Sequence, residues 1–121
     1  MTPPAGHYQP FVRAGDTVYV SGQVPRLSDG SYEPADVATE TALALDNLAA
    51  VVRAAGGDQT CVVKVTAYLT DVADFAEFDR AYAAHFGEWK PARTTVVAGL
   101  RSVKVEVDAV LHLPSAIGDG E

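Results

Sequence analysis

The sequence predicts an α+β fold in which two helices pack on one face of a mixed sheet. Two long segments carry apolar residues at spacings of three and four, which is typical of a helix with one buried side. Five shorter segments are strand-like, and most of them alternate apolar and polar residues. The predicted order is β-β-α-β-α-β-β, and helices gathered on one side of a sheet form an α+β sandwich.

The first two strands are expected within residues 7–25, on either side of a turn at residues 14–16. Val18 and Val20 share one side of the second strand in a period-2 pattern. Residues 26–34 then form a loop, in which Asp-Gly is a turn signal.

Asp36 is the expected N-cap of a long first helix that ends near Gly56 or Gly57. Leu43 and Val51 lie beside its apolar stripe, so the apolar surface is wider than a one-sided helix needs. This excess width indicates a second packing partner. The stripe itself consists of Val37, Thr41, Leu45, Leu48, Val52 and Ala55.

A third strand is expected over residues 61–70, followed by a second helix that Asp71 caps and that runs through Phe86, with Gly87 just beyond its end. Alternating residues form the packed face of the strand: Val63, Val65, Ala67 and Leu69. Aromatic residues at helical spacing are expected in the core: Phe75, Phe78, Tyr82 and Phe86.

The last two strands are expected over residues 93–100 and 103–113. The opposite side of the final strand carries Lys104, Glu106 and Asp108, which makes it unusually charged for a strand inside a sheet. A symmetric oligomer that covers this mixed face would explain the pattern. The packed face consists of Val103, Val105, Val107, Ala109 and Leu111.

Composition favours one domain over residues 1–121, with loose ends at about 1–6 and 115–121. Hydrophobic residues make up 48% of the chain, enough for a core, yet no apolar run approaches the ~20 residues of a membrane span. A net charge of −7 disfavours nucleic acid and anionic membranes as partners. No secretory signal is visible, so the expected location is the cytoplasm.

Neither metal binding nor cysteine chemistry is expected. Cys61 is the one cysteine, so no internal disulfide can form, and we interpret it as a small structural residue. The histidines, His7, His85 and His112, are scattered and lack ligand spacing. Phosphate-loop and nucleophile-elbow motifs are also missing from the sequence.

Arg93 and Glu106 are the strongest candidates for chemistry. Arg93 begins a β-branched run, and its guanidinium can hold a carboxylate through two parallel hydrogen bonds. Glu106 can act as a general base if it is partly removed from water. The alternatives are a weak surface ion pair for Arg93 and one member of a polar strand face for Glu106. Hydroxyl groups that could join them belong to Tyr8, Ser21, Thr94 and Thr95.

Several segments together resemble the YjgF–RidA family of reactive-intermediate imine deaminases. They are "GDTVYVSGQVP", "ALALDNLAAVVRAAGG", "VVKVTAYLTDVADFAEFDRAYAAHF" and "KPARTTVVAGL" with the later "VKVEVDAV", and the resemblance runs from about Gly6 to Leu113. It implies a homotrimer with a chorismate-mutase-like α+β fold and ligand clefts between subunits. It also implies hydrolysis of 2-imino acids, or their enamine tautomers, to 2-keto acids and ammonia without a cofactor.

The same resemblance implies roles for particular residues. Arg93 matches the arginine that holds the substrate carboxylate. Glu106 matches the acidic residue that orients or activates the attacking water. Tyr8 and Ser21 match residues that line the pocket, and backbone groups near Thr95 match part of the carboxylate clamp.

Two positions depart from the best-characterised branch of the family. Thr95 stands where a cysteine is common, and Asp79 stands where an asparagine is found. A carboxylate at Asp79 would repel an anionic substrate if it faced the cleft, so it bears on the range of substrates. The turn before the last strand, within "AGLRSVKVEV", is also shorter than in many members.

Other functions are compatible with parts of the sequence. The main alternative is a trimer of the same fold whose clefts bind or sense small carboxylates without turnover. An endoribonuclease is disfavoured by the acidic charge and by the lack of paired His or Lys groups. A chorismate mutase would need more cations than the sequence lets us place.

Overall fold

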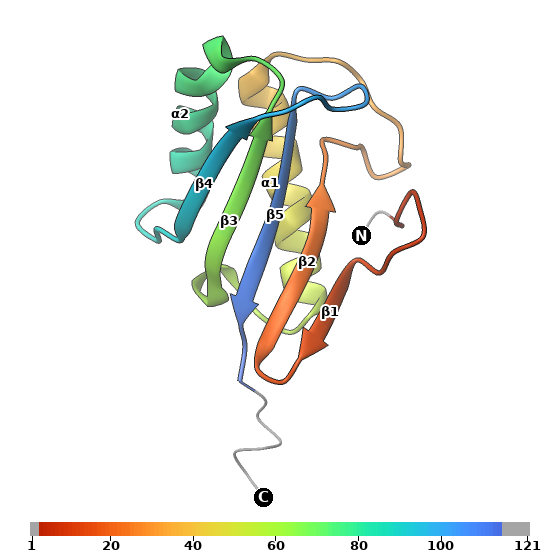
Figure 1. Ribbon diagram of the computed structural model, residues 1–121, viewed down its shortest axis with the longest axis vertical. Helices are drawn as coiled ribbons and strands as arrows, with labels where there is room; N and C mark the ends of the chain where they lie inside the picture. Colours follow the sequence, from red (N-terminus) through yellow and green to blue (C-terminus); the bar gives the residue numbers. More distant parts are fainter. Residues whose placement is uncertain (1–2, 115–121) are drawn as a thin grey trace, which may run out of the picture.

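The computed structural model describes residues 3–114 and shows a five-stranded sheet with two helices on one face (Figure 1). The strands are β1 (Phe11–Ala14), β2 (Thr17–Gln23), β3 (Val62–Leu69), β4 (Ala92–Val97) and β5 (Val105–His112). Their order across the sheet is β1-β2-β5-β3-β4, in which β3 and β4 run parallel and all other neighbours run antiparallel. The predicted α+β sandwich with a mixed sheet is confirmed.

Helices α1 (Val37–Ala54) and α2 (Phe75–Phe86) cover the same face of the sheet. Asp36 caps α1 as predicted, because its carboxylate accepts a hydrogen bond from a backbone N–H in the first turn. The second helix starts later than predicted. Asp71 caps a separate 3-10 turn, Val72–Asp74, and α2 begins only after this turn.

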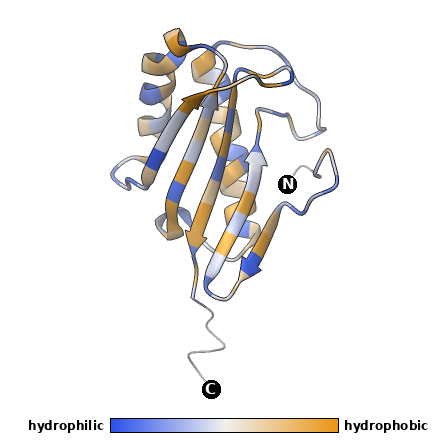
Figure 2. Ribbon diagram, viewed as in Figure 1, coloured by the Kyte–Doolittle hydropathy of each residue, from blue (hydrophilic) through white to orange (hydrophobic). Residues whose placement is uncertain are grey.

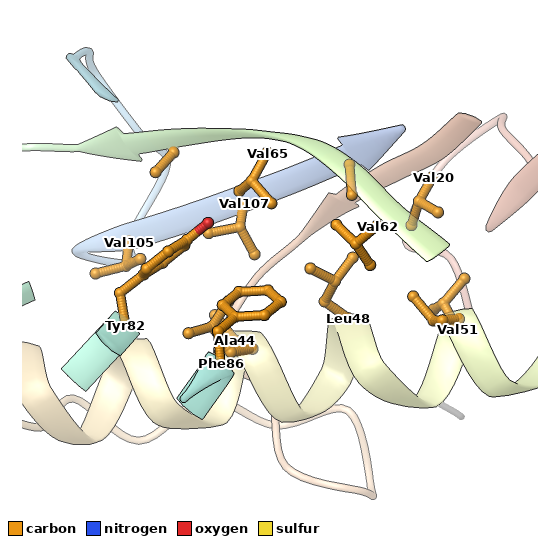
Figure 3. Close-up of a cluster of buried hydrophobic side chains, with 14 of the residues drawn as sticks. Val20, Ala44, Leu48, Val51, Val62, Val65, Tyr82, Phe86, Val105 and Val107 are labelled. Carbon is orange, nitrogen blue, oxygen red and sulfur yellow. The ribbon is translucent and has the colours of Figure 1, made fainter. Parts of the chain in front are cut away.

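The core fills the space between the helices and the sheet. Figure 3 shows side chains from α1 and α2 meeting valines of β2, β3 and β5. Two residues that the sequence assigns to the core are instead exposed. Phe75 is 42% exposed at the start of α2. Val63 is 43% exposed because the register of β3 against β5 shifts between Val62 and Lys64, which buries Val62 in its place.

The two C-terminal strands are shorter than predicted. β4 ends at Val97 and β5 begins at Val105, so residues 98–104 form a loop at one end of the sheet. Val103 is buried as expected, although it lies in this loop and not in a strand.

None of the helices within residues 3–114 is long and apolar enough to cross a membrane. The cytoplasmic location stays a prediction, as does the single domain. Of the expected loose ends, residues 1–2 and 115–121 lie outside the described part of the chain.

Candidate functional site

Arg93 lies at the start of β4, an edge strand of the sheet, and its side chain points toward α2. Its Nη1 atom is 2.8 Å from Oδ1 of Asp79, which lies on α2. The guanidinium carbon also lies over three aromatic rings of α2, at 4.6 Å from the centroid of Tyr82, 5.4 Å from Phe78 and 5.7 Å from Phe75. These contacts restrict the guanidinium to one position at the start of β4.

A groove of about 320 Å³ adjoins this cation, between the end of α2 and the start of β4. We call it the Arg93 groove. Its lining consists of Asp79, Tyr82, Ala83, Phe86, Gly87, Trp89, Lys90, Pro91 and Arg93. Asp79 therefore lies beside the clamp residue that the sequence predicts, and its carboxylate already offsets part of the charge of Arg93.

Two buried hydroxyl groups lie on the same side of the sheet as Arg93. Thr95 is two residues further along β4, and its Oγ1 atom is buried without a hydrogen-bond partner within residues 3–114. The hydroxyl of Tyr82 is likewise buried without a partner in that part of the chain. Thr94 faces the other side, where its Oγ1 accepts a hydrogen bond of 2.6 Å from Lys64 Nζ.

Glu106 lies on β5 at a second groove, of about 540 Å³, which we call the Glu106 groove. Its lining consists of Ala5, Gly6, Tyr8, Gly22, Val24, Arg26, Gly30, Tyr32, Arg101, Ser102, Val103 and Glu106. A Cβ atom at Gly22 would meet the Glu106 carboxylate, so the glycine leaves space for this side chain in its observed position. The glycine of the Ser-Gly-Gln motif thus makes room for a side chain more than 80 residues away in sequence.

The environment of Glu106 opposes its ionisation. Burial, and secondly the negative charge of Asp108, raise the pKa of Glu106 above its usual value. No side chain or backbone group within residues 3–114 donates a hydrogen bond to its carboxylate. A carboxylate with a raised pKa and free lone pairs is suited to accept a proton from a bound water.

Tyr8 and Ser21 have different relations to this groove. Tyr8 lines it directly. Ser21 anchors the segment that carries Tyr8, because its hydroxyl donates a hydrogen bond of 2.6 Å to the carbonyl oxygen of Gln9 and its backbone N–H donates one of 3.0 Å to that of Pro10. Ser21 is therefore placed to position the wall of the groove.

Arg93 and Glu106 do not meet within one chain. Val65 pairs with Arg93 in β4 and with Ala109 in β5, and residues paired side by side share a face of the sheet. Ala109 is buried beneath the helices, so Arg93 lies on the helix face. Glu106 is an odd number of residues from Ala109 and lies on the opposite, uncovered face. Each groove therefore holds half of the predicted site.

Sequence reasoning missed two arginines at the Glu106 groove. Arg26 comes from the loop after β2, and Arg101 comes from the loop before β5. Both arginines lie in segments that the sequence predicts as loops or turns. Such segments have no periodic pattern from which the direction of a side chain could be predicted. Only the packing of the loops shows that the two cations line one groove.

A buried glutamate ties these loops together. Glu40 of α1 is 1% exposed, and its carboxylate accepts hydrogen bonds from the backbone N–H groups of Lys104 and Ala35 at 2.9 and 3.1 Å. It also accepts from the Tyr32 hydroxyl at 2.6 Å and from Lys104 Nζ at 3.2 Å. Burial opposes ionisation, but these bonds outweigh it and lower the pKa of Glu40. We call Glu40, Tyr32, Ala35 and Lys104 the Glu40 latch.

The other candidates for chemistry lie outside both grooves or are unsuited to it. Burial raises the pKa of the Cys61 thiol, which packs against the core as a structural residue. Within residues 3–114, no three side chains of His, Cys, Asp or Glu gather closely enough to hold a metal ion.

Comparison with known proteins gives consistent matches over nearly the whole chain. A family model described as Endoribonuclease L-PSP matches residues 1–113. A RutC family protein from Pyrococcus horikoshii is 38% identical over 112 residues, covering 90% of this chain and 89% of the relative. The 2-iminobutanoate/2-iminopropanoate deaminase of Escherichia coli K12 is 39% identical over 110 residues, covering 87% and 86%.

Solved structures agree with these sequence matches. The crystal structure of Escherichia coli TdcF with bound serine has a TM-score of 0.86 and 33% identity, covering 94% of this chain and 93% of that one. The structure of the Escherichia coli YjgF gene product, at 35% identity, has a TM-score of 0.85 and covers 92% of each chain.

Proposed function

This chain belongs to the endoribonuclease L-PSP family, which is the YjgF–RidA family, and from that premise we propose that it hydrolyses 2-imino acids to 2-keto acids and ammonia without a cofactor. The observation that carries the proposal is the state of Glu106. Its carboxylate faces an open groove, is partly removed from water and has a raised pKa, which are the properties of a general base. An arginine clamp for the substrate carboxylate, at Arg93, supplies the other requirement.

The reaction needs little more than these two groups. Water adds to C2 of the iminium form, a C–O bond forms, the C=N π electrons move to nitrogen, and Glu106 accepts the proton that the water loses. Glu106 then returns that proton to the nitrogen and accepts the hydroxyl proton as the C–N bond breaks. The products are a 2-keto acid and ammonia, which takes the last proton from Glu106. A positioned base contributes about 10²–10⁴-fold to such a step.

Arg93 retains the donors that a substrate carboxylate needs. A guanidinium has five N–H donors on three nitrogen atoms, and the ion pair with Asp79 is made at Nη1. The Arg93 guanidinium is therefore held by Asp79 and by the aromatic rings, and its remaining N–H groups can bind a ligand. This arrangement favours a ligand that carries both charges, because an iminium group can approach Asp79 while its carboxylate binds Arg93.

We further propose a homotrimer whose ligand clefts lie between subunits. Because the Arg93 and Glu106 grooves lie on opposite faces of one sheet, a second copy of the chain is needed to bring the two groups together. The face without helices supports an interface. Figure 2 shows hydrophobic and hydrophilic residues alternating along the strands, as expected where one face of a sheet is buried under helices and the other is not. Large apolar side chains are exposed in this sheet: Val12 (54%), Tyr19 (53%), Val63 (43%) and Val96 (40%).

The deaminase proposal is tested by generating 2-iminopropanoate with an amino-acid oxidase and following its decay with a trapping nucleophile. We expect the protein to accelerate the decay, and Arg93→Ala and Glu106→Gln each to remove most of the acceleration. Arg80→Ala and Glu88→Gln are matched controls, because both residues are exposed and lie outside the two grooves. No acceleration by the unaltered protein, or full acceleration by Arg93→Ala, would rule the proposal out. A monomeric mass at micromolar concentration would contradict the trimer.

The alternative is a binding protein of the same fold, and the serine in the TdcF structure favours it as a second candidate. Both functions use Arg93, so Glu106 must discriminate between them. A deaminase loses turnover in Glu106→Gln but keeps its affinity for the stable product 2-oxobutanoate. A binder shows the same affinity for this product and no turnover in either form.

A further inference from the structure

We propose that the Glu106 groove selects dicarboxylic 2-imino acids, and that Arg26 and Arg101 bind the second carboxylate. This inference rests on the proposed function, in which Arg93 holds the first carboxylate. It adds a substrate class, and it assigns a role to two cations that the deaminase mechanism does not use.

The two arginines are uncompensated cations in an acidic protein. The chain has a net charge of −7, yet within residues 3–114 no carboxylate lies within 4.0 Å of either guanidinium. Glu106 lies in the same groove but beyond that distance. By contrast, Arg93 is paired with Asp79, and Lys104 is paired with Glu40. The Glu106 groove is therefore lined by two arginines that are available to bind an anionic ligand.

The remaining lining fits a polar ligand. Tyr8, Tyr32 and Ser102 line the groove, and small residues of the N-terminal segment leave it open; the Tyr32 hydroxyl itself is bound to Glu40. At about 540 Å³ the groove has room for a chain of four or five carbons in addition to the reacting centre. Two arginines also line this groove, and a guanidinium group matches the planar, bidentate geometry of a carboxylate.

Both loops that carry the arginines are held in place. The side-chain amide of Asn47 donates hydrogen bonds of 2.8 and 3.0 Å to the carbonyl oxygens of Val24 and Arg26, which fixes the loop after β2. The Glu40 latch joins the later part of that loop to Lys104, near the end of the loop that carries Arg101. Figure 1 shows the two loops at the same end of the sheet. A cation on an anchored loop loses less entropy when it binds an anion.

A ligand with a neutral side chain would leave both arginines without an anionic partner, whereas a second carboxylate would pair with them. Charge-assisted hydrogen bonds are about twice as strong as neutral ones. We therefore expect dicarboxylates to bind at least about tenfold more tightly than monocarboxylates of similar length, which corresponds to about 1.4 kcal/mol.

The inference is tested first by binding, without turnover. Calorimetric titration at fixed ionic strength compares 2-oxopentanedioate and 2-oxobutanedioate with 2-oxobutanoate. The expected result is a tenfold or larger preference for the dicarboxylates, which Arg26→Ala and Arg101→Ala each reduce and which Arg101→Glu abolishes. Arg53→Ala is the matched control, because it changes the net charge equally but lies in the last turn of α1, away from this groove.

An equal affinity for both ligand classes would overturn the inference. So would an equal loss of preference in Arg53→Ala, because the effect would then come from overall charge. A second measurement follows the decay of 2-iminobutanedioate, generated by an aspartate oxidase, beside that of 2-iminopropanoate. If neither imine decays faster, the deaminase proposal fails, and the binding preference alone still decides the inference. If only the monocarboxylic imine decays faster, the inference fails and the deaminase proposal stands.

Discussion

Glu40 binds the chain just before β5, and Glu106 lies at the start of β5, yet the surroundings of the two glutamates shift their pKa values in opposite directions. Glu40 binds Lys104, which lies two residues before Glu106 on the way into β5. Glu40 is almost fully buried and accepts four hydrogen bonds, so its pKa is lowered. Glu106 is less buried, accepts none within residues 3–114 and faces Asp108, so its pKa is raised.

The difference shows that burial alone does not set the protonation of a carboxylate. Removal from water opposes ionisation at both positions, and the supply of donors decides which way the pKa moves. Donors at Glu40 make it a structural anion that joins α1 to two loops. The lack of donors at Glu106 leaves lone pairs available for a water and a proton. Glu40 thus serves the stability of the fold, whereas Glu106 has the properties that the proposed reaction needs.

Glu40→Gln is expected to have the largest effect on stability. The amide would carry no charge, and its N–H groups would face the N–H and O–H donors that now bind the Glu40 carboxylate. We expect this to lower the free energy of unfolding by about 2–4 kcal/mol. Because the folded-state pKa of Glu40 is lowered, its contribution is present above the ordinary value of 4.5 and is lost as the pH falls.

Urea unfolding at several pH values measures this effect. The difference between the unaltered protein and Glu40→Gln should begin to shrink below about pH 4.5, where the unfolded chain takes up a proton at Glu40, and it should go on shrinking as the pH falls through the lower pKa of the folded state. Glu33→Gln is the control, because Glu33 is an exposed glutamate of the same loop region. A loss below about 0.5 kcal/mol in Glu40→Gln would show that the latch does not stabilise the fold.

Gly22→Ala is expected to have a smaller effect on stability and a clear effect on turnover. The new Cβ atom meets the end of the flexible Glu106 side chain, which can rotate away at little cost in folding energy. A displaced base is less effective, and we expect kcat to fall about 10–100-fold while the unfolding midpoint changes little.

Steady-state kinetics and urea unfolding together measure the Gly22→Ala effect. Gly99→Ala is the matched control, because no atom lies within 4 Å of a Cβ built there and its φ is not positive. Unchanged turnover in Gly22→Ala would mean that the position of Glu106 over Gly22 is unimportant for the reaction.

Asp108→Asn is expected to have the smallest effect, on the pH dependence alone. Glu106 must be ionised to act as a base, so kcat/KM falls as the pH drops through its raised pKa. Removing the charge of Asp108 lowers that pKa, and the acid limb of the pH profile should move to lower pH. An amide oxygen can still accept the hydrogen bond of the Tyr68 hydroxyl, which is 2.7 Å from Asp108 Oδ2.

The ratio of kcat/KM between Asp108→Asn and the unaltered protein removes the titration of the imine itself, which is the same in both. This ratio should rise toward acid pH. A ratio that stays constant with pH would indicate that Glu106 is not the group that titrates in the reaction.

Most of the fold could be predicted from the sequence, because periodicity is a local property. The strands, the two helices and the Asp36 cap are in place, and Phe78, Tyr82 and Phe86 are buried as expected. The errors come from non-local effects. Val63 is exposed because β3 shifts its register against β5, which lies far away in sequence, and Phe75 lies over Arg93 instead of entering the core.

Local patterns in the sequence are enough to predict the element order, most of the packed faces and the two residues to test, Arg93 and Glu106. How these residues are combined depends on the tertiary structure. The register of β3 with β4 and β5 puts Arg93 and Glu106 on opposite faces of one sheet. The packing of α2 pairs Arg93 with Asp79, and the packing of two loops brings Arg26 and Arg101 to one groove. Side-chain periodicity indicates which way a residue points within its own strand, but the pairing of distant strands and the anchoring of loops depend on contacts across the whole chain.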